Sequence, residues 1–268
     1  MTAQRRGTIA GLGCGWLAVV VSGLAVGGCF PSEANFQPTY TEVAIFIDRT
    51  EAEERNRHQL VEAQEVERIP PLVTQPVMGE SRLRGGSVAV YPIADNSLLP
   101  NAPRVSIPVG EANENKFQRF KIIEGFTTDV QENIGRLVRD APILGIAEGL
   151  TYQQSFIVQP LCQFLETVDS ASQPHARRVL LVYSDLLEHS PVFSFYAHSE
   201  EYVQEHRDEI VDRFMSECGS VTTPVAAGYQ FVQQPLGKGQ SDTMLLQARR
   251  VWNAFFQRLG LEEQSVLN

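Results

Sequence analysis

The chain has 268 residues, of which 43% are hydrophobic and 20% are charged. These fractions are typical of a globular protein and exclude a disordered chain, a collagen-like repeat and a protein with several membrane spans. Its formal net charge of −10 argues against a nucleic-acid-binding protein, which needs a basic face.

The beginning of the chain has the pattern of an export signal. Arg5 and Arg6 precede an uncharged run over residues 7–32 whose centre is apolar. A short positive segment, an apolar run and an exit of small residues are typical of secreted proteins. The run is also long enough to span a bilayer, so an uncleaved membrane anchor is the alternative. Its many glycines count against that alternative.

The exit of this run, residues 26–29, reads Val-Gly-Gly-Cys and resembles the lipobox of bacterial lipoproteins. In that family the cysteine is lipidated on its sulfur and becomes the first residue of the mature chain. The resemblance implies that residues 1–28 are a removed signal peptide, that Cys29 carries the lipid, and that residues 29–40 form a linker. The protein is then anchored in the bacterial cell membrane or outer membrane, facing the periplasm or the exterior.

Two cysteines remain in the body of the exported chain, Cys162 and Cys218. The oxidising compartment permits a disulfide between them. Two buried free thiols are the alternative, because cysteine also packs well as a small apolar residue.

The body of the chain alternates between apolar runs typical of strands and segments whose apolar residues recur at helical spacing. We expect strands over 42–48, 87–95, 104–110, 177–185 and 223–233, and helices over 50–68, 117–138, 151–168, 199–217 and 242–259. Alternation at this spacing implies crossover connections. The sequence therefore predicts a single doubly wound α/β domain over residues 41–265, with a mainly parallel sheet and helices on both faces.

Some local details follow from single residues. Pro70-Pro71 should end the first helix, and Pro160 should kink its helix or delay its start. Ser241 or Asp242 should cap the last helix. One face of the helix over 117–138 should be buried, with Phe117, Phe120, Ile123, Val130, Ile134, Leu137 and Val138 on it.

Two predicted strands end in an aspartate, Asp48 after "AIFI" and Asp185 after "VLLVYS". Ligands bind at the carboxyl ends of strands in open α/β sheets. Over residues 41–260 the arrangement resembles the von Willebrand factor A-like domain, also called integrin I-like. In that family the first strand ends in Asp-x-Ser-x-Ser, a middle Thr precedes a helix, and a later strand ends in Thr-Asp or Ser-Asp. Together they form a metal-ion-dependent adhesion site.

Matched to this motif, Asp48 is the first Asp, Thr50 the first hydroxyl, Thr151 the middle Thr and Asp185 the later Asp. Ala52 stands where the second hydroxyl is expected, so the motif is incomplete. The resemblance implies a Mg²⁺ site with one position open to a carboxylate of a partner protein. The alternative is that the two aspartates only cap the helices that follow them.

The resemblance also implies that the two aspartate-bearing strands are neighbours and flank the topological switch point of the sheet. The carboxylates of Asp48 and Asp185 should then lie within about 4–8 Å of each other, a distance that an ion can bridge. Two such negative charges repel, so one carboxylate should pair with a cation or have a raised pKa. Arg49 is the nearest basic residue in the sequence.

The chain has no nucleophile elbow and no phosphate-binding loop. Its five histidines do not have the spacing of a zinc site. We therefore expect a non-enzymatic, membrane-tethered module that binds another envelope protein. The alternative is an envelope enzyme or a small-ligand-binding lipoprotein whose site these motifs do not reveal.

Overall fold

The computed structural model describes residues 39–48, 63–74, 84–93, 104–110, 114–135, 154–169, 177–219, 227–233 and 241–264. The chain divides into Met1–Asn35 and Phe36–Asn268, and every element below belongs to the second unit. Cys29, Thr50 and Thr151 lie outside the described residues. Within the described ranges, no helix has both the length and the apolar character needed to cross a bilayer.

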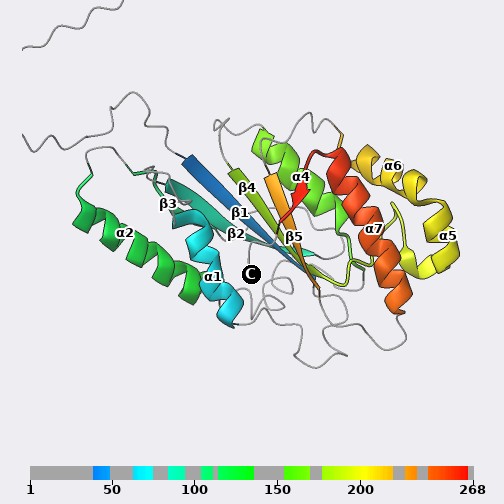
Figure 1. Ribbon diagram of the computed structural model, residues 1–268, viewed down its shortest axis with the longest axis horizontal. Helices are drawn as coiled ribbons and strands as arrows, with labels where there is room; N and C mark the ends of the chain where they lie inside the picture. The colour runs from blue at the N-terminus through cyan, green and yellow to red at the C-terminus, as the bar shows by residue number, and fades with distance from the viewer. Residues whose placement is uncertain are drawn as a thin grey trace, which may run out of the picture. The chain divides into compact units, whose positions relative to one another are not determined.

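In the described part, six strands form one sheet in the order β3-β2-β1-β4-β5-β6 (Figure 1). They are β1 (Thr39–Asp48), β2 (Arg84–Ile93), β3 (Arg104–Ile107), β4 (Arg177–Ser184), β5 (Ala227–Gln233) and β6 (Glu262–Glu263). All neighbouring pairs are parallel except β2 and β3. This sheet confirms the predicted α/β class and its mainly parallel character.

Helices cover both faces of the sheet. They are α1 (Ala63–Thr74), α2 (Lys116–Asp129) with the π-helical turn η2 (Val130–Ile134), α4 (Val158–Asp169), α5 (Glu200–Glu205), α6 (Arg207–Glu217) and α7 (Asp242–Arg258). Alternate residues of a strand point to opposite faces. Phe46 of β1 packs into the core under α4 to α7, whereas Ile45 and Ile47 pack into the core under α1, α2 and η2. Both cores are apolar, as expected for a sheet buried on both sides.

The order of the strands places a topological switch point at the centre of the sheet. The chain runs from β1 outward through β2 to β3, and later from β4 outward through β5 to β6. The connections therefore diverge between β1 and β4, which pair in parallel. This is the adjacency that the sequence analysis expects for the strands carrying Asp48 and Asp185.

The prediction that Pro70-Pro71 end the first described helix is wrong. Helix α1 contains both prolines and continues to Thr74, whose Oγ1 donates a hydrogen bond to the carbonyl of Pro70 at 3.0 Å. Val66, Ile69 and Val73 lie on one side of α1 and are buried. Their packing on the sheet stabilises the helix, which offsets the missing N–H groups.

The prediction that the first phenylalanines of α2, Phe117 and Phe120, lie on its buried face is also wrong. Phe117 is 82% exposed and Phe120 is 65% exposed, while Arg119 and Phe126 are buried. With about 100° of rotation per residue, Phe117 lies about 180° around the helix from Phe126. Phe117 and Phe120, the two exposed phenylalanines, therefore lie away from the side of the helix on which Phe126 packs against the sheet.

The remaining helices confirm two predictions, the delayed start of the helix with Pro160 and the cap of the last helix, and correct one. Helix α4 begins at Val158, so Pro160 lies in its first turn, where a missing N–H is tolerated. The segment 199–217 forms two helices that meet at His206. Ser241 caps α7, because its Oγ accepts hydrogen bonds from the backbone N–H groups of the next turn.

A disulfide joins Cys162 of α4 to Cys218, which follows α6, with 4.6 Å between the Cα atoms. From the sequence alone, these two cysteines could form either a disulfide or two free thiols. The bond links two helices that lie on the same face of the sheet.

Candidate functional site

Asp48 is the last residue of β1 and lies at the switch point, only 3% exposed. Its Oδ2 accepts a hydrogen bond from Ser184 Oγ at 2.8 Å, and its Oδ1 accepts one from Ser155 Oγ at 3.4 Å. Ser184 ends the neighbouring strand β4, and Ser155 lies in the segment before α4. Three segments far apart in the sequence thus meet at one carboxylate.

The turn after β4 is held by hydrogen bonds from its own side chains and from a side chain of α7. Ser184 Oγ accepts the N–H of Leu186 at 2.9 Å, and Asp185 Oδ1 accepts the N–H of Leu187 at 3.0 Å. Leu186 has a φ of 66°, an uncommon conformation for a residue with a side chain. Trp252 of α7 donates its indole N–H to the carbonyl of Leu186 at 2.8 Å. Such strained backbone persists only where the surroundings hold it.

Glu188 is a fully buried carboxyl next to this turn. Its Oε2 accepts the backbone N–H groups of Ile157 at 2.8 Å and Val158 at 3.1 Å, where α4 begins. Its Oε1 is buried. Burial raises the pKa of Glu188 to about 8, and the negative charge of Asp48 contributes to the shift, whereas hydrogen bonding with the Ser190 side chain lowers the pKa of this carboxyl. Glu188 is therefore protonated at neutral pH.

The carboxyl near Asp48 whose pKa is raised is that of Glu188, which the sequence analysis did not select. The expectation that Asp48 or Asp185 pairs with a cation or has a raised pKa stays a prediction. Ser155 and Ser184 were also missed. Ser184 had a signal, since it is the Ser of the Ser-Asp pair that ends the strand. For Glu188, nothing in "LLEHS" distinguishes a buried carboxyl from a solvated one.

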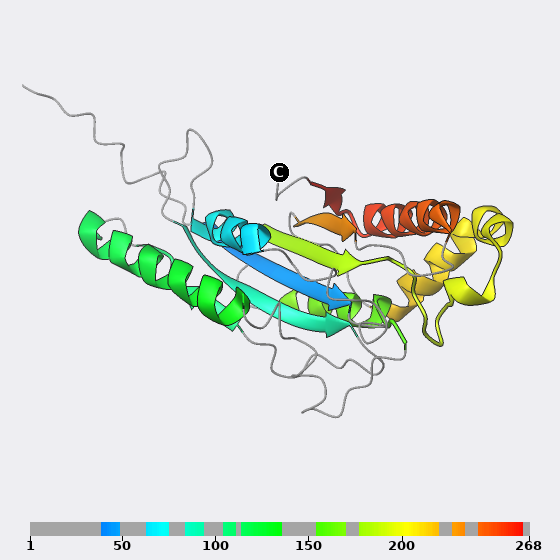
Figure 2. The ribbon, with the colours of Figure 1, turned by 90° about the horizontal axis from the view of Figure 1, so that it is seen from below.

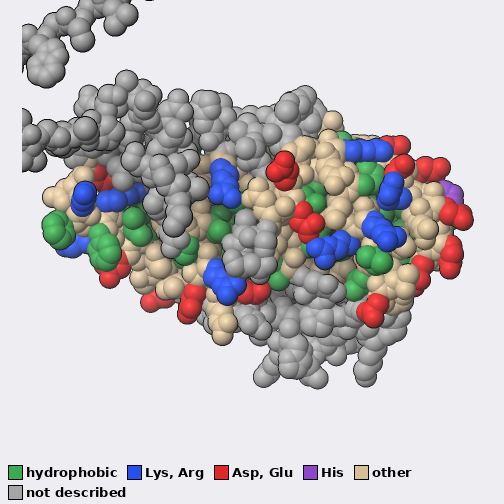
Figure 3. All heavy atoms as spheres, viewed as in Figure 1, with side chains coloured by type: hydrophobic (Ala, Val, Ile, Leu, Met, Phe, Trp, Pro, Cys, Tyr) green, Lys and Arg blue, Asp and Glu red, His purple; other side chains and the backbone are tan. Residues whose placement is uncertain are grey.

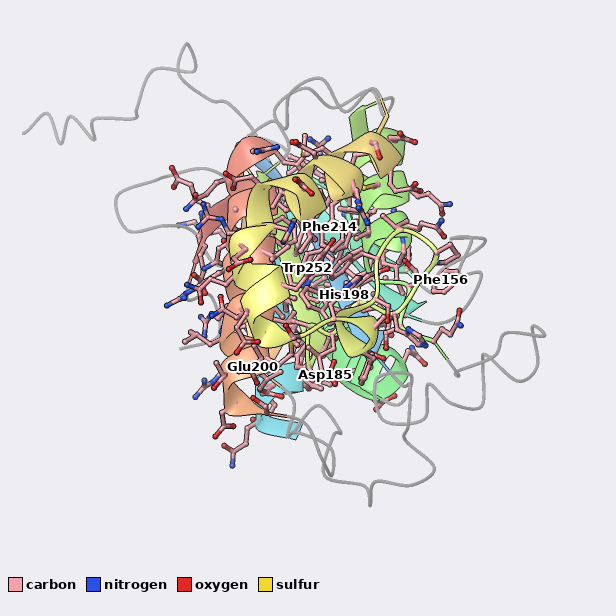
Figure 4. All side chains as sticks on the ribbon, turned by 90° about the vertical axis from the view of Figure 1, so that its right-hand side faces the viewer. Phe156, Asp185, His198, Glu200, Phe214 and Trp252 are labelled. Atoms are coloured by element: carbon pink, nitrogen blue, oxygen red, sulfur yellow. A yellow bond between two sulfur atoms is a disulfide. The ribbon has the colours of Figure 1, made fainter. Side chains whose placement is uncertain are left out.

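Asp185 follows β4 and lines a cavity of about 210 Å³ between the ends of β4 and β5 and the start of α7. The cavity is lined by Asp185, Leu186, Phe231, Asp242, Leu245, Leu246 and Arg249. Ser241, which precedes the cavity-lining Asp242, donates a hydrogen bond from its Oγ to Glu200, and Figure 4 labels both Glu200 and Asp185. Trp252 and Phe214 pack against each other deeper in the core, with ring centroids 4.9 Å apart.

The alternative of a simple helix cap does not fit Asp185, whereas for Asp48 it stays open, because residues 49–62 lie outside the described ones. Residues 185–188 are not helical, and the carboxylate of Asp185 accepts its hydrogen bond within a turn. Asp48 accepts hydrogen bonds from two side-chain hydroxyls. The four-residue set of Asp48, Thr50, Thr151 and Asp185 stays a prediction, because Thr50 and Thr151 lie outside the described residues.

The site presents hard oxygen atoms. They belong to the carboxyl groups of Asp48 and Glu188 and to the hydroxyl groups of Ser155 and Ser184. No group of three or more His, Cys, Asp or Glu side chains able to hold a metal occurs in the part of the chain that the structure describes. A cation here would depend on hydroxyl oxygens and water as well as carboxylates, a ligand set that suits Mg²⁺.

These features define an α/β protein of the doubly wound class with an acidic, hydroxyl-rich site at its switch point. No protein-family model matches the chain, and no curated protein sequence matches it. Its function is inferred below from the geometry of the site and the pattern at the beginning of the chain.

Proposed function

We propose that the chain is a lipid-anchored protein of the bacterial envelope whose α/β domain, of the von Willebrand factor A-like type, binds another envelope protein. The observation that carries this proposal is the meeting of Asp48, Ser155 and Ser184 at the switch point. Connections diverge there and a ligand gains access to strand ends. The Val-Gly-Gly-Cys exit at residues 26–29 supports the lipid anchor on Cys29.

The residues present fit a hard divalent cation. Asp48 would hold Mg²⁺ together with the hydroxyl oxygens of Ser155 and Ser184. When bound, the cation would supply a positive charge and an exchangeable position for a carboxylate of the partner. This role needs no nucleophile, so the proposed activity is binding rather than catalysis.

Calorimetric titration with Mg²⁺ and with Mn²⁺ tests the cation. The wild-type protein should release or absorb heat in a saturable way, and Asp48→Asn should abolish that heat. Asp208→Asn is the matched control, because this aspartate is exposed in the first turn of α6 and should leave the heat unchanged. Equal heats for all three proteins, or none for the wild type, would contradict a cation at Asp48.

Copurification from detergent-solubilised envelope tests the interaction. The wild-type protein should retain a specific partner that Asp48→Asn loses, while Asp208→Asn retains it. A protein retained equally by all three variants would contradict recognition at the Asp48 site.

A small-ligand-binding lipoprotein is the second candidate, and the cavity beside Asp185 favours it. Its walls combine Asp185, Asp242 and Arg249 with leucine and phenylalanine side chains, a mixture typical of ligand sites. Its volume of about 210 Å³ limits it to a small molecule. A compound that raises the melting temperature of the wild type but not of Leu245→Trp, which fills the cavity, would support this candidate.

A further inference from the structure

We propose that the first two turns of α2 form a surface that docks onto an anionic lipid bilayer. We define this α2 surface as Lys116, Phe117, Phe120 and Lys121. The proposal rests on the proposed function only for the membrane tether and not on the site at Asp48. It explains why two large aromatic side chains face solvent on a helix that is otherwise attached to the sheet.

The apolar part of the α2 surface is a pair of phenylalanines one helical turn apart. Phe117 is 82% exposed and Phe120 is 65% exposed. Residues three apart on a helix are neighbours, so these side chains form one patch rather than two separate exposures. Hydrophobic side chains lie at the surface over α2, with basic side chains beside them (Figure 3). Phenylalanine on an exposed helix face with lysine beside it is typical of helices that lie in a membrane interface.

The charges around the patch are positive, in contrast to the chain as a whole. Lys116 and Lys121 are two of the three lysines in the sequence, and residues 116–123 contain no acidic residue, although the net charge is −10. At about 100° per residue the two lysines flank the phenylalanines on either side. The beginning of a helix also carries the positive end of its dipole. This combination complements the anionic headgroups of a lipid surface.

The acidic side chain of Glu124 limits the contact to the start of the helix. Glu124 follows Phe117 by seven residues and lies on the same side, two turns further on. It is exposed and would be repelled by anionic lipid. The helix should therefore meet the bilayer with its first two turns.

The helix is held so that this patch points outward. The side chain of Asn115 accepts the N–H of Phe117, which caps the helix. On the opposite side, the buried Arg119 donates from Nη1 to the carbonyl of Pro108 at 2.9 Å and lies 3.8 Å from Glu114. These contacts attach the start of α2 to the segment after β3, so turning the phenylalanines inward would break them.

The α2 surface lies near the place where the tether enters the domain. The backbone of Pro108 and Val109 passes so close to Gly85 that a Cβ there would lie within 2.6 Å of it, and Gly85 pairs with Tyr40 at the start of β1. Ten residues separate Cys29 from Thr39, and an extended chain of that length spans at most about 35 Å. Figure 2 shows α2 at the end of the sheet where β1 begins. A lipid on Cys29 would thus keep the bilayer within reach of the α2 surface.

Tryptophan fluorescence of the full chain in vesicles tests this proposal. Phe117→Trp is made on a Trp16→Phe background, which leaves only the fully buried Trp252 as a constant signal. The protein is reconstituted into vesicles of phosphatidylglycerol and phosphatidylethanolamine that carry brominated acyl chains. We expect the introduced tryptophan to emit at shorter wavelength and to be quenched by the bromines. Lys116→Gln with Lys121→Gln should weaken membrane contact by about fivefold for each lysine.

The matched control is Glu205→Trp on the same background, because Glu205 is exposed on α5, at the far end of the domain from α2 in Figures 1 and 2. In vesicles, the tryptophan at position 205 should emit at the same wavelength as in detergent and should not be quenched by the bromines. Equal behaviour at positions 117 and 205 would overturn the proposal. A shift at position 117 that grows with protein density and lacks quenching would assign the surface to a second copy and also overturn it. Flotation of the chain with the vesicles reports separately on the tether.

Discussion

At the scale of single residues, the site at the switch point consists of one carboxylate held by hydroxyls and one carboxyl kept neutral by burial. Asp48 is held by Ser184 and Ser155, and Glu188 reaches the beginning of α4. Each of these contacts joins segments that are distant in the sequence. The local sequence predicted that the strands end in polar residues, but it had no information on which hydroxyl would meet Asp48.

The raised pKa of Glu188 predicts a specific dependence of stability on pH. Its pKa is about 8 in the folded chain against an ordinary value of 4.5. Folding therefore takes up a proton between these two values, and the free energy of unfolding should fall by several kcal/mol as the pH rises from about 4.5 to about 8. Denaturant unfolding of Glu188→Gln should lack this decline. Glu205→Gln, on the exposed surface of α5, should keep it, and a Glu188→Gln curve parallel to the wild type would refute the assignment.

Ser184→Ala should lower the free energy of unfolding by about 1–3 kcal/mol, because it removes a hydroxyl that donates to buried Asp48 and accepts from Leu186. Ser216→Ala removes a hydroxyl from the exposed end of α6. That control should change the free energy by no more than about 0.5 kcal/mol. Equal effects of the two variants in urea unfolding would show that the hydroxyl of Ser184 carries no special role.

At the scale of elements, the sequence predicted whether a segment is a helix or a strand better than it predicted the residues at which that segment begins and ends. Continuous apolar runs such as that of β4 are strong signals, and both faces of the sheet are indeed buried. The errors arose where tertiary packing outweighs local preference. Helix α1 passes through Pro70 and Pro71 because its apolar side packs on the sheet, and α2 exposes Phe117 because its buried side is set by Phe126. The two-residue strand β6 has too few residues to show a pattern.

The bond between Cys162 and Cys218 should stabilise the helices on the α4 to α7 face. Its partners are 56 positions apart, and closing a loop of that length contributes about 4 kcal/mol in the chain-entropy description. A reductant should therefore lower the melting temperature of the wild-type protein. The double variant Cys162→Ser with Cys218→Ser should melt at the lower temperature already and be insensitive to the reductant. A reductant-sensitive double variant would contradict this account.

At the scale of the whole molecule, the proposed tether and the proposed recognition site lie at opposite ends of β1. The linker enters at Thr39, whereas Asp48 ends the strand nine residues later, a length of about 30 Å. If the α2 surface meets the bilayer, the carboxyl edge of the sheet is directed away from it. The net charge of the chain, −10, agrees with this orientation, since an acidic surface is repelled by anionic lipid except at the α2 surface.

Lipidation of Cys29 is the prediction on which this orientation depends. Cells that express the wild-type chain and take up a palmitate analogue should label the protein, and Cys29→Ala should not be labelled. Cys162→Ser with Cys218→Ser is the control, since those cysteines form the disulfide and should leave labelling unchanged. A labelled Cys29→Ala protein would place the lipid elsewhere or leave the uncleaved anchor as the tether.

The central claim, recognition of an envelope protein at the carboxyl edge, is tested most directly by photo-crosslinking in the intact envelope. A photoreactive residue at Pro191, exposed in the segment after Glu188, should give one discrete adduct with another protein, and Asp48→Asn should abolish it. The same residue at Ser216, exposed at the end of α6, should give none. No adduct from position 191, or the same adduct from both positions regardless of Asp48, would contradict the claim.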